Sequence, residues 1–180
     1  MNSEDIRYSL RNNLGAKVDF LGSFPRENIE NFKIPPIRKK PICKIYNTLT
    51  SYSRRKLGHW VTICISASPQ KIIYYLDSSG LSPEVYGESF SIFFRKNPSY
   101  EVKYFTNQIQ PLNSRLCALY NIYLVREFSL NGIRKTLFKM RKTFSLNSLK
   151  KNDIHVMKYY LRNLNRRSCQ YLKKYSELII

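Results

Sequence analysis

Cys117, His59 and Asp77 are the residues whose side chains could carry out acyl-transfer chemistry together. Cys117 follows Ser114, which can cap a helix, so the thiol is expected in the first helical turn. There, unpaired backbone N–H groups and the helix dipole favour a thiolate. A cysteine nucleophile needs a general base and a group that orients this base. His59 and Asp77 can take these two roles, and Gln110 can donate a side-chain N–H to a developing oxyanion.

Two neighbouring segments, predicted to be strands, carry the histidine and the aspartate. Residues 59–66 are β-branched and apolar on both faces, which is typical of a buried strand, and residues 71–76 form a second strand. A short turn joins them. In an antiparallel hairpin the start of one strand faces the end of the next, so His59 and Asp77 are expected to meet.

The rest of the chain predicts an α+β fold, with a mixed β-sheet and flanking helices. A third strand is expected at 100–105, and helices at 3–14, from 82 to about 96, and at 114–132, 133–144 and 153–175. Residues 22–41 hold four prolines and are expected to be an extended loop, whereas 42–49 fit either a helix or a strand. We expect one domain over residues 1–180, with a catalytic core at about 6–130 and a basic helical C-terminal portion at 133–180.

Positive charge dominates the composition. The chain has 31 Lys and Arg against 12 Asp and Glu, a net charge of +19, and residues 133–180 hold 13 basic residues against two acidic ones. Such a balance attracts polyanions, of which nucleic acid is the commonest inside cells, although a solvated surface that keeps the protein soluble would look similar. The candidate DNA-binding residues are Arg38, Lys39, Lys40, Arg54, Arg55, Lys56, Arg141, Lys142, Arg166, Arg167, Lys173 and Lys174.

The remaining cysteines and histidine give no metal-binding pattern. No two cysteines form a C-x-x-C pair and no Cys/His cluster has zinc spacing, so no metal is expected. No apolar run approaches the roughly 20 residues that span a bilayer, and the N-terminal segment carries acids, so neither a membrane span nor secretion is expected. In a reducing compartment Cys43, Cys64 and Cys169 would be structural free thiols. His155 is expected to be a surface or core residue.

Several motifs, taken in order, resemble the adenovirus-type cysteine protease (adenain) family. They are Gly58-His59-Trp60-Val61, then Tyr75-Leu76-Asp77-Ser78-Ser79-Gly80, then Gln110-Pro111-Leu112-Asn113-Ser114-Arg115-Leu116-Cys117. The glutamine lies seven residues before the cysteine, as it does in that family. Phe20-Leu21-Gly22-Ser23-Phe24 and Asn47-Thr48 resemble two further family segments, so the resemblance covers about residues 6–130.

This resemblance implies a cysteine endopeptidase with the fold shared by adenain and the ubiquitin-like-modifier proteases. Cys117 would be the nucleophile, His59 the base and Asp77 the orienting acid. Gln110 and the backbone N–H of Cys117 would form the oxyanion hole, and Trp60 would pack beside the imidazole. The reaction would run through thiolate attack, an acyl-enzyme, release of the amine and hydrolysis by water.

The resemblance also implies substrates and cofactors, with some departures. Such enzymes cut capsid and core precursors during virion maturation, and are stimulated by DNA and by a capsid-derived peptide joined through a disulfide. Residues 97–107 hold no cysteine, so this disulfide is not expected here, although an activating peptide stays open. Asp77 stands where the family often has Glu, and Ala118 where it usually has Gly. We expect a monomer with no obligatory cofactor, in the virion and host nucleus or another reducing compartment, encoded by a virus or a virus-like transposon.

Two alternatives stay open. A protease that removes ubiquitin-like modifiers would share the His-Trp and Gln–Cys arrangement. A basic DNA-binding or packaging protein without catalysis would share the charge but would not use the reactive residues.

Overall fold

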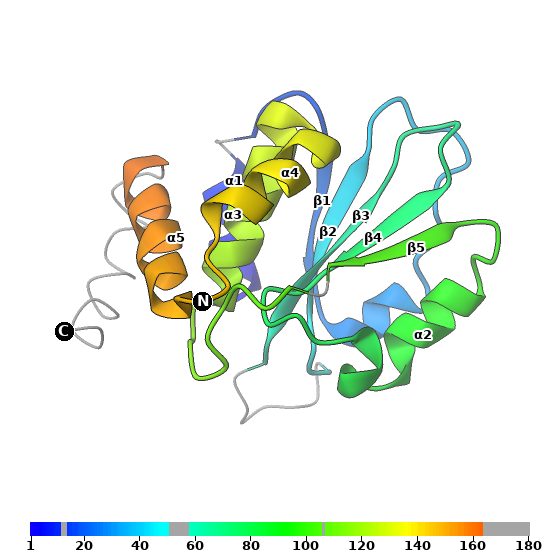
Figure 1. Cartoon of the computed structure of the whole chain (residues 1–180). Helices are drawn as coiled ribbons and strands as arrows, with labels where there is room; N and C mark the ends of the chain where they lie inside the picture. The colour runs from blue at the N-terminus through cyan, green and yellow to red at the C-terminus, as the bar shows by residue number, and fades with distance from the viewer. Residues whose placement is uncertain (12–13, 51–57, 106, 164–180) are drawn as a thin grey trace.

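A five-stranded β-sheet forms the centre of the molecule, which is described by a computed structural model over residues 1–11, 14–50, 58–105 and 107–163. The strands lie side by side in chain order (Figure 1): β1 (Asp19–Phe24), β2 (Ile42–Asn47), β3 (Trp60–Ile65), β4 (Ile72–Leu76) and β5 (Glu101–Phe105). The two outer pairs, β1/β2 and β4/β5, are parallel, and the two inner pairs are antiparallel. The predicted α+β fold with a mixed sheet and flanking helices is therefore confirmed.

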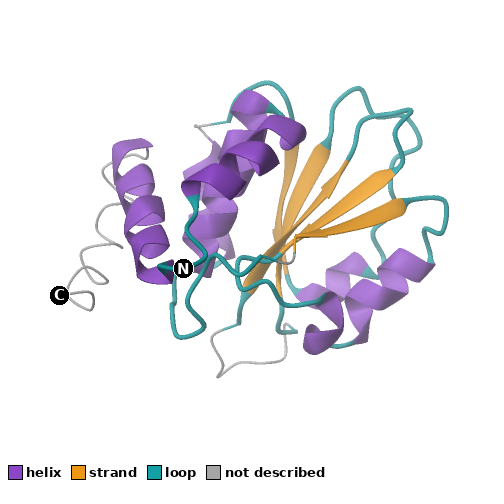
Figure 2. Cartoon of the chain, viewed as in Figure 1, coloured by secondary structure: helices purple, strands orange, loops and turns teal. Residues whose placement is uncertain are grey.

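Helices cover both faces of this sheet and give three layers (Figure 2). One face carries α1 (Ser3–Arg11), α3 (Cys117–Asn131), α4 (Ile133–Thr143) and α5 (Leu149–Asn163). The other carries α2 (Glu88–Arg95) with the short 3₁₀ helices η1 (Arg26–Ile29) and η2 (Pro83–Tyr86). None of the helices within the described ranges is long and apolar enough to cross a membrane.

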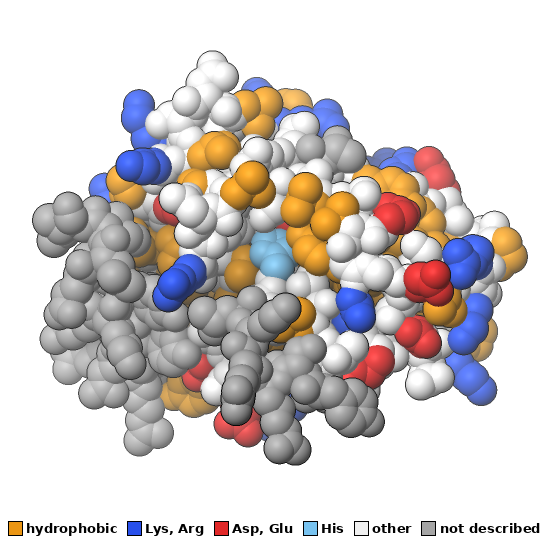
Figure 3. Space-filling view, turned by 90° about the horizontal axis from the view of Figure 1, so that it is seen from below, with side chains coloured by type: hydrophobic (Ala, Val, Ile, Leu, Met, Phe, Trp, Pro, Cys, Tyr) orange, Lys and Arg blue, Asp and Glu red, His pale blue; other side chains and the backbone are white. Residues whose placement is uncertain are grey.

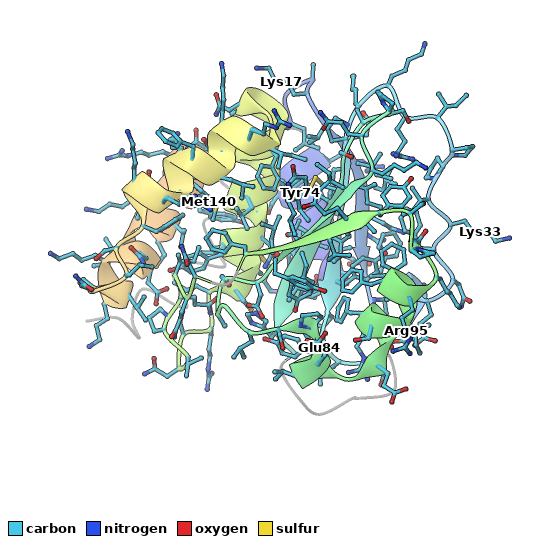
Figure 4. The ribbon with its side chains drawn as sticks, turned by 45° about the vertical axis from the view of Figure 1, so that its right-hand side comes forward. Lys17, Lys33, Tyr74, Glu84, Arg95 and Met140 are labelled. Atoms are coloured by element: carbon cyan, nitrogen blue, oxygen red, sulfur yellow. A yellow bond between two sulfur atoms is a disulfide. The ribbon has the colours of Figure 1, made fainter. Side chains whose placement is uncertain are left out.

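Strand β3 is buried on both faces because its side chains alternate between two hydrophobic cores. Trp60 and Cys64 belong to the core beneath α3, whereas Val61 and Ile63 belong to the core beneath α2. On the α3 side, Tyr74 of β4 and Met140 of α4 are both part of the core, as the sticks between helix and sheet in Figure 4 illustrate. This two-sided burial fixes the strand that leads out of His59.

Helix α3 is buried around most of its circumference. Twelve of its fifteen residues are buried, from Cys117 to Ser129, because the helix lies between the sheet and helices α1, α4 and α5. A helix that is apolar all round belongs in a protein interior. The first residue of this helix, Cys117, is therefore held by a rigid element.

Some element boundaries differ from those that the sequence predicts. Residues 22–41, expected to be an extended loop, contain the end of β1 and all of η1, and 42–49 begin with a strand. The helix expected from 82 to 96 is divided at Gly87, whose φ of +96° interrupts it between η2 and α2. Helix α3 begins at Cys117 with Leu116 as its N-cap, so Ser114 does not cap it. Helix α5 starts at Leu149, and its expected extension to 175 lies outside the described residues.

Cys43 and Cys64 form a disulfide, which corrects the expectation that they are free thiols. They are Cα partners in the antiparallel register of β2 and β3, and both are fully buried. Because this register brings together residues 21 positions apart, their sequence spacing gave no signal of the bond. Cys117 is the free cysteine among the described residues, and Cys169 lies outside them.

Candidate active site

His59 and Asp77 meet at one end of the central hairpin, as predicted. His59 directly precedes β3, and Asp77 directly follows β4, which is antiparallel to it. His59 Nε2 and Asp77 Oδ1 are 2.6 Å apart. Asp77 is fully buried, whereas the His59 side chain is 18% exposed, so the imidazole is accessible from solvent and the carboxylate is not.

Three donors hold the Asp77 carboxylate. Besides the contact with His59, Oδ1 accepts a bond from the backbone N–H of Ser79 at 2.7 Å, and Oδ2 accepts one from the hydroxyl of Tyr86 at 2.7 Å. The ring of Tyr86 also stacks on the imidazole, with centroids 5.7 Å apart and an interplanar angle of 18°. Tyr86 therefore fixes both members of the pair at once.

The Cys117 side chain interacts with the imidazole of His59. Burial lowers the pKa of His59, but hydrogen bonds and charge interactions with Asp77 and Cys117 outweigh it and raise this pKa to about 9. Because Nε2 contacts Asp77, the other ring nitrogen, Nδ1, is the one available to the sulfur. Cys117 is 8% exposed and lies at the N-terminus of α3, whose first turn holds no acidic residue. The arrangement places the sulfur beside an imidazole whose protonated form is stabilised.

The backbone on either side of His59 is held by the end of β2. The Thr48 hydroxyl accepts a bond from the His59 N–H at 3.1 Å, and the Thr48 N–H donates to the His59 carbonyl at 2.7 Å. Gly58 packs so closely against Asn47 that a Cβ there would lie 1.8 Å from the Asn47 side-chain oxygen. The Asn47-Thr48 and Gly58-His59 motifs thus have a shared structural reason.

Gln110 is buried and its side-chain amide is fixed at both ends. Ser78, the residue after Asp77, donates its hydroxyl to Gln110 Oε1, and its carbonyl accepts the backbone N–H of Gln110 at 2.9 Å. Gln110 Nε2 donates to the carbonyl of Ser114 at 2.9 Å. An amide nitrogen carries two hydrogens and this bond uses one of them. The side-chain nitrogen of Gln110 therefore faces the segment that leads into Cys117 and keeps one hydrogen for a further acceptor.

Asn121 links the histidine strand to the nucleophile helix. Its side-chain nitrogen donates to the carbonyl of Trp60 at 2.8 Å and to the carbonyl of Cys117 at 2.7 Å, while its oxygen bonds the hydroxyl of Thr62. Asn121 and Thr62 are buried, so these bonds are shielded from water.

Tyr86 and Asn121 were not predicted as site residues, for different reasons. Tyr86 belongs to a segment expected to be continuous helix, where an aromatic residue gives no sign of contact with a site. Asn121 is a lone polar residue among apolar helix positions, and this break in the pattern was the available signal.

Trp60 was expected to pack beside the imidazole of His59. It lies in the α3-side core together with Leu116 and Cys117, and the ring stacked on the imidazole is that of Tyr86.

One of the candidate DNA-binding residues proves to be internal. Arg38 is 6% exposed, and its guanidinium donates to the carbonyls of Ser66 and Pro35 and lies over the ring of Tyr100. The expectation that Arg38 contacts phosphate is therefore wrong, because these bonds use its guanidinium to close a loop. Lys39, Lys40, Arg141 and Lys142 are exposed, and Arg54, Arg55, Lys56, Arg166, Arg167, Lys173 and Lys174 lie outside the described residues.

The second histidine, His155, has different surroundings from those of His59. His155 on α5 is exposed on one side and packs edge-to-face against Tyr123 and Phe144 on the other. Within residues 1–11, 14–50, 58–105 and 107–163, no group of three or more His, Cys, Asp or Glu side chains could hold a metal ion.

In Figure 3, which views the molecule from below, a histidine side chain is visible at the centre of the face between groups of hydrophobic side chains.

Comparison with solved structures finds distant similarities. The chain resembles a crystal structure of a de-sumoylating protease, with a TM-score of 0.45 and 18% sequence identity over 98% of this chain and 83% of that one. No protein-family model and no curated protein matches the sequence.

Proposed function

We propose that this protein is a cysteine peptidase in which Cys117 attacks a peptide carbonyl. The observation that carries the proposal is His59, whose imidazole is hydrogen-bonded to the buried carboxylate of Asp77 and interacts with the side chain of Cys117. A nucleophile, a base and an orienting carboxylate in one interacting series are the arrangement of thiol hydrolases.

The proposal assigns a group of the chain to each step of this reaction. The thiolate of Cys117 adds to the carbonyl carbon, and the negative charge on the oxygen is met by the N–H groups of Gln110 and of the Cys117 backbone. The imidazolium of His59 gives its proton to the leaving amine, which leaves a thioester. Neutral His59 then takes a proton from water, whose hydroxide releases the acid product, and Asp77 holds the ring throughout.

The finer proposal is an adenain-like endopeptidase that matures capsid and core precursors of a virus or virus-like element. It is supported by the order of motifs from residue 58 to residue 117 and by the charge of +19. The alternative substrate is a conjugate of a ubiquitin-like modifier, which the same chemistry would cleave.

A substrate panel distinguishes these two possibilities. We expect cleavage of peptides with a glycine before the scissile bond and an aliphatic residue upstream, and at least about tenfold lower kcat/KM for folded ubiquitin-like conjugates, a difference of ~1.4 kcal/mol. Mass spectrometry of the products gives the cleaved bond. Faster processing of a folded modifier would instead assign the chain to the modifier proteases.

Binding to a polyanion is proposed through the exposed basic side chains Lys39, Lys40, Arg141 and Lys142. Replacing Arg141 and Lys142 by glutamine should lower duplex DNA affinity and reduce the slope of log affinity against log salt by about 0.9 for each lost phosphate contact. The control is Lys33→Gln, an exposed lysine in the segment before β2, which points into solvent on the side of the molecule away from α4 (Figure 4). If Arg141 and Lys142 do not contact phosphate, the wild type and the glutamine variant will have the same slope of log affinity against log salt. Salt-dependent DNA binding by a chain whose Cys117 is unreactive would favour the packaging alternative.

A further inference from the structure

We propose that helix α5 is part of the catalytic apparatus, with Asn152 and Asp153 as positioning residues for the loop that carries Gln110. This inference rests on the proposed peptidase function, since it concerns the oxyanion-binding loop at 109–116. The helix belongs to the basic C-terminal portion, which the motifs had left outside the catalytic core.

Asn152 ties the start of this loop to α5. Its side chain is buried, and its nitrogen donates to the carbonyl of Ile109 at 2.9 Å and to the carbonyl of Ser145 at 2.7 Å. Its oxygen accepts the N–H of Ser145 at 2.9 Å. Both hydrogens of the amide are used, so its orientation is determined and its hold on Ile109, the neighbour of Gln110, is rigid.

Asp153 ties the end of the same loop to α5. Its carboxylate accepts a hydrogen bond from the hydroxyl of Tyr120 at 2.8 Å and also interacts with the side chain of Ser114. Ser114 is the residue whose carbonyl receives Gln110 Nε2. Tyr120 is fully buried on α3, so Asp153 joins the loop to the helix that begins with Cys117.

The opposite side of the loop is held by the catalytic hairpin. The Ser78 carbonyl accepts the N–H groups of Ile109 and Gln110, both at 2.9 Å, directly after Asp77. The loop is thus fixed between the sheet and α5. An oxyanion donor contributes only when it is preorganised at the position that the charge will occupy, so loss of one support should reduce transition-state stabilisation.

The test separates the oxyanion site from the nucleophile. Asn152→Asp keeps the size and the acceptor but cannot donate to Ile109, and Asn152→Leu removes all three bonds. We expect each to lower kcat/KM for the cleaved peptide by ~10²-fold, with the loss mainly in kcat, and to weaken a peptide aldehyde, whose adduct carries the oxyanion, by a similar factor. Alkylation of Cys117 by iodoacetamide forms no oxyanion, so its rate and pH profile should change less than about twofold.

The control is Ile154→Ala on the same helix, because Ile154 is 40% exposed. A parallel loss of alkylation and turnover in the Asn152 variants would show general damage and overturn the proposal, as would unchanged turnover. Hydrogen exchange gives an answer that does not depend on activity: protection of 109–116 should fall in Asn152→Asp while 60–65 stays protected, and unchanged protection would overturn the positioning role. A wild-type chain without turnover or aldehyde binding would overturn the peptidase function, while hydrogen exchange would still decide whether α5 holds the loop.

Discussion

Replacing Cys117 by alanine is expected to abolish peptide cleavage, with a fall in kcat of at least about 10⁴-fold, because no other group supplies the attacking electron pair. The buried position at the start of α3 should leave folding intact, since alanine fills most of the thiol's space. Turnover and thermal melting of the two proteins, measured side by side, check both statements.

Thiol labelling makes the same prediction sharper. Cys43 and Cys64 form a disulfide, so the thiols that iodoacetamide can label are those of Cys117 and Cys169, and mass spectrometry identifies which one is modified. We expect Cys117 to react fastest at neutral pH and its modification to stop turnover in proportion. The matched control is Cys169→Ala, which should keep full turnover. Cleavage that survives in Cys117→Ala would contradict the mechanism.

The central hairpin was the part of the fold that local sequence determined. A continuous apolar run at 59–66, a turn and a second run at 71–76 have one economical pairing, and that pairing brings His59 and Asp77 to the same end. Strand β1 and the Cys43–Cys64 bond depend on how β2 pairs with both of its neighbours. Such partners are distant along the chain and leave no local pattern, so they could not be predicted.

The residues of the candidate site also fall into those that local sequence predicted and those that it did not. Cys117, His59 and Asp77 were found because their chemistry is rare and their place in local elements was readable. Tyr86, Asn121 and Asn152 act through ordinary side chains whose partners are fixed only by tertiary packing. The roles of residues that position catalytic groups therefore became visible only in the three-dimensional structure.

Replacing Asp77 by asparagine should move the pH dependence of the site and lower kcat by ~10²- to 10⁴-fold, because the ring loses its charged partner. The asparagine oxygen can still face His59 and Ser79, and its nitrogen can donate to the Tyr86 hydroxyl, so local geometry should survive. The pKa of His59, about 9, depends on hydrogen bonds and charge interactions with both Asp77 and Cys117. Without the carboxylate charge this pKa should fall by about 1–3 units.

The sign of the effect follows from which form is active. The imidazolium stabilises the thiolate and protonates the leaving amine, so the wild-type rate should decline as the pH rises through about 9, where His59 loses its proton. In Asp77→Asn the same decline in cleavage should begin at lower pH, whereas alkylation of Cys117, which needs only the thiolate and no proton donor, should show no such decline. Tyr86→Phe is the matched control, because it removes the hydroxyl bond to Asp77 but keeps the stacked ring and the carboxylate charge. In Tyr86→Phe the decline of the cleavage rate at alkaline pH should stay close to that of the wild type. If this decline does not move to lower pH in Asp77→Asn, the carboxylate does not set the protonation of His59.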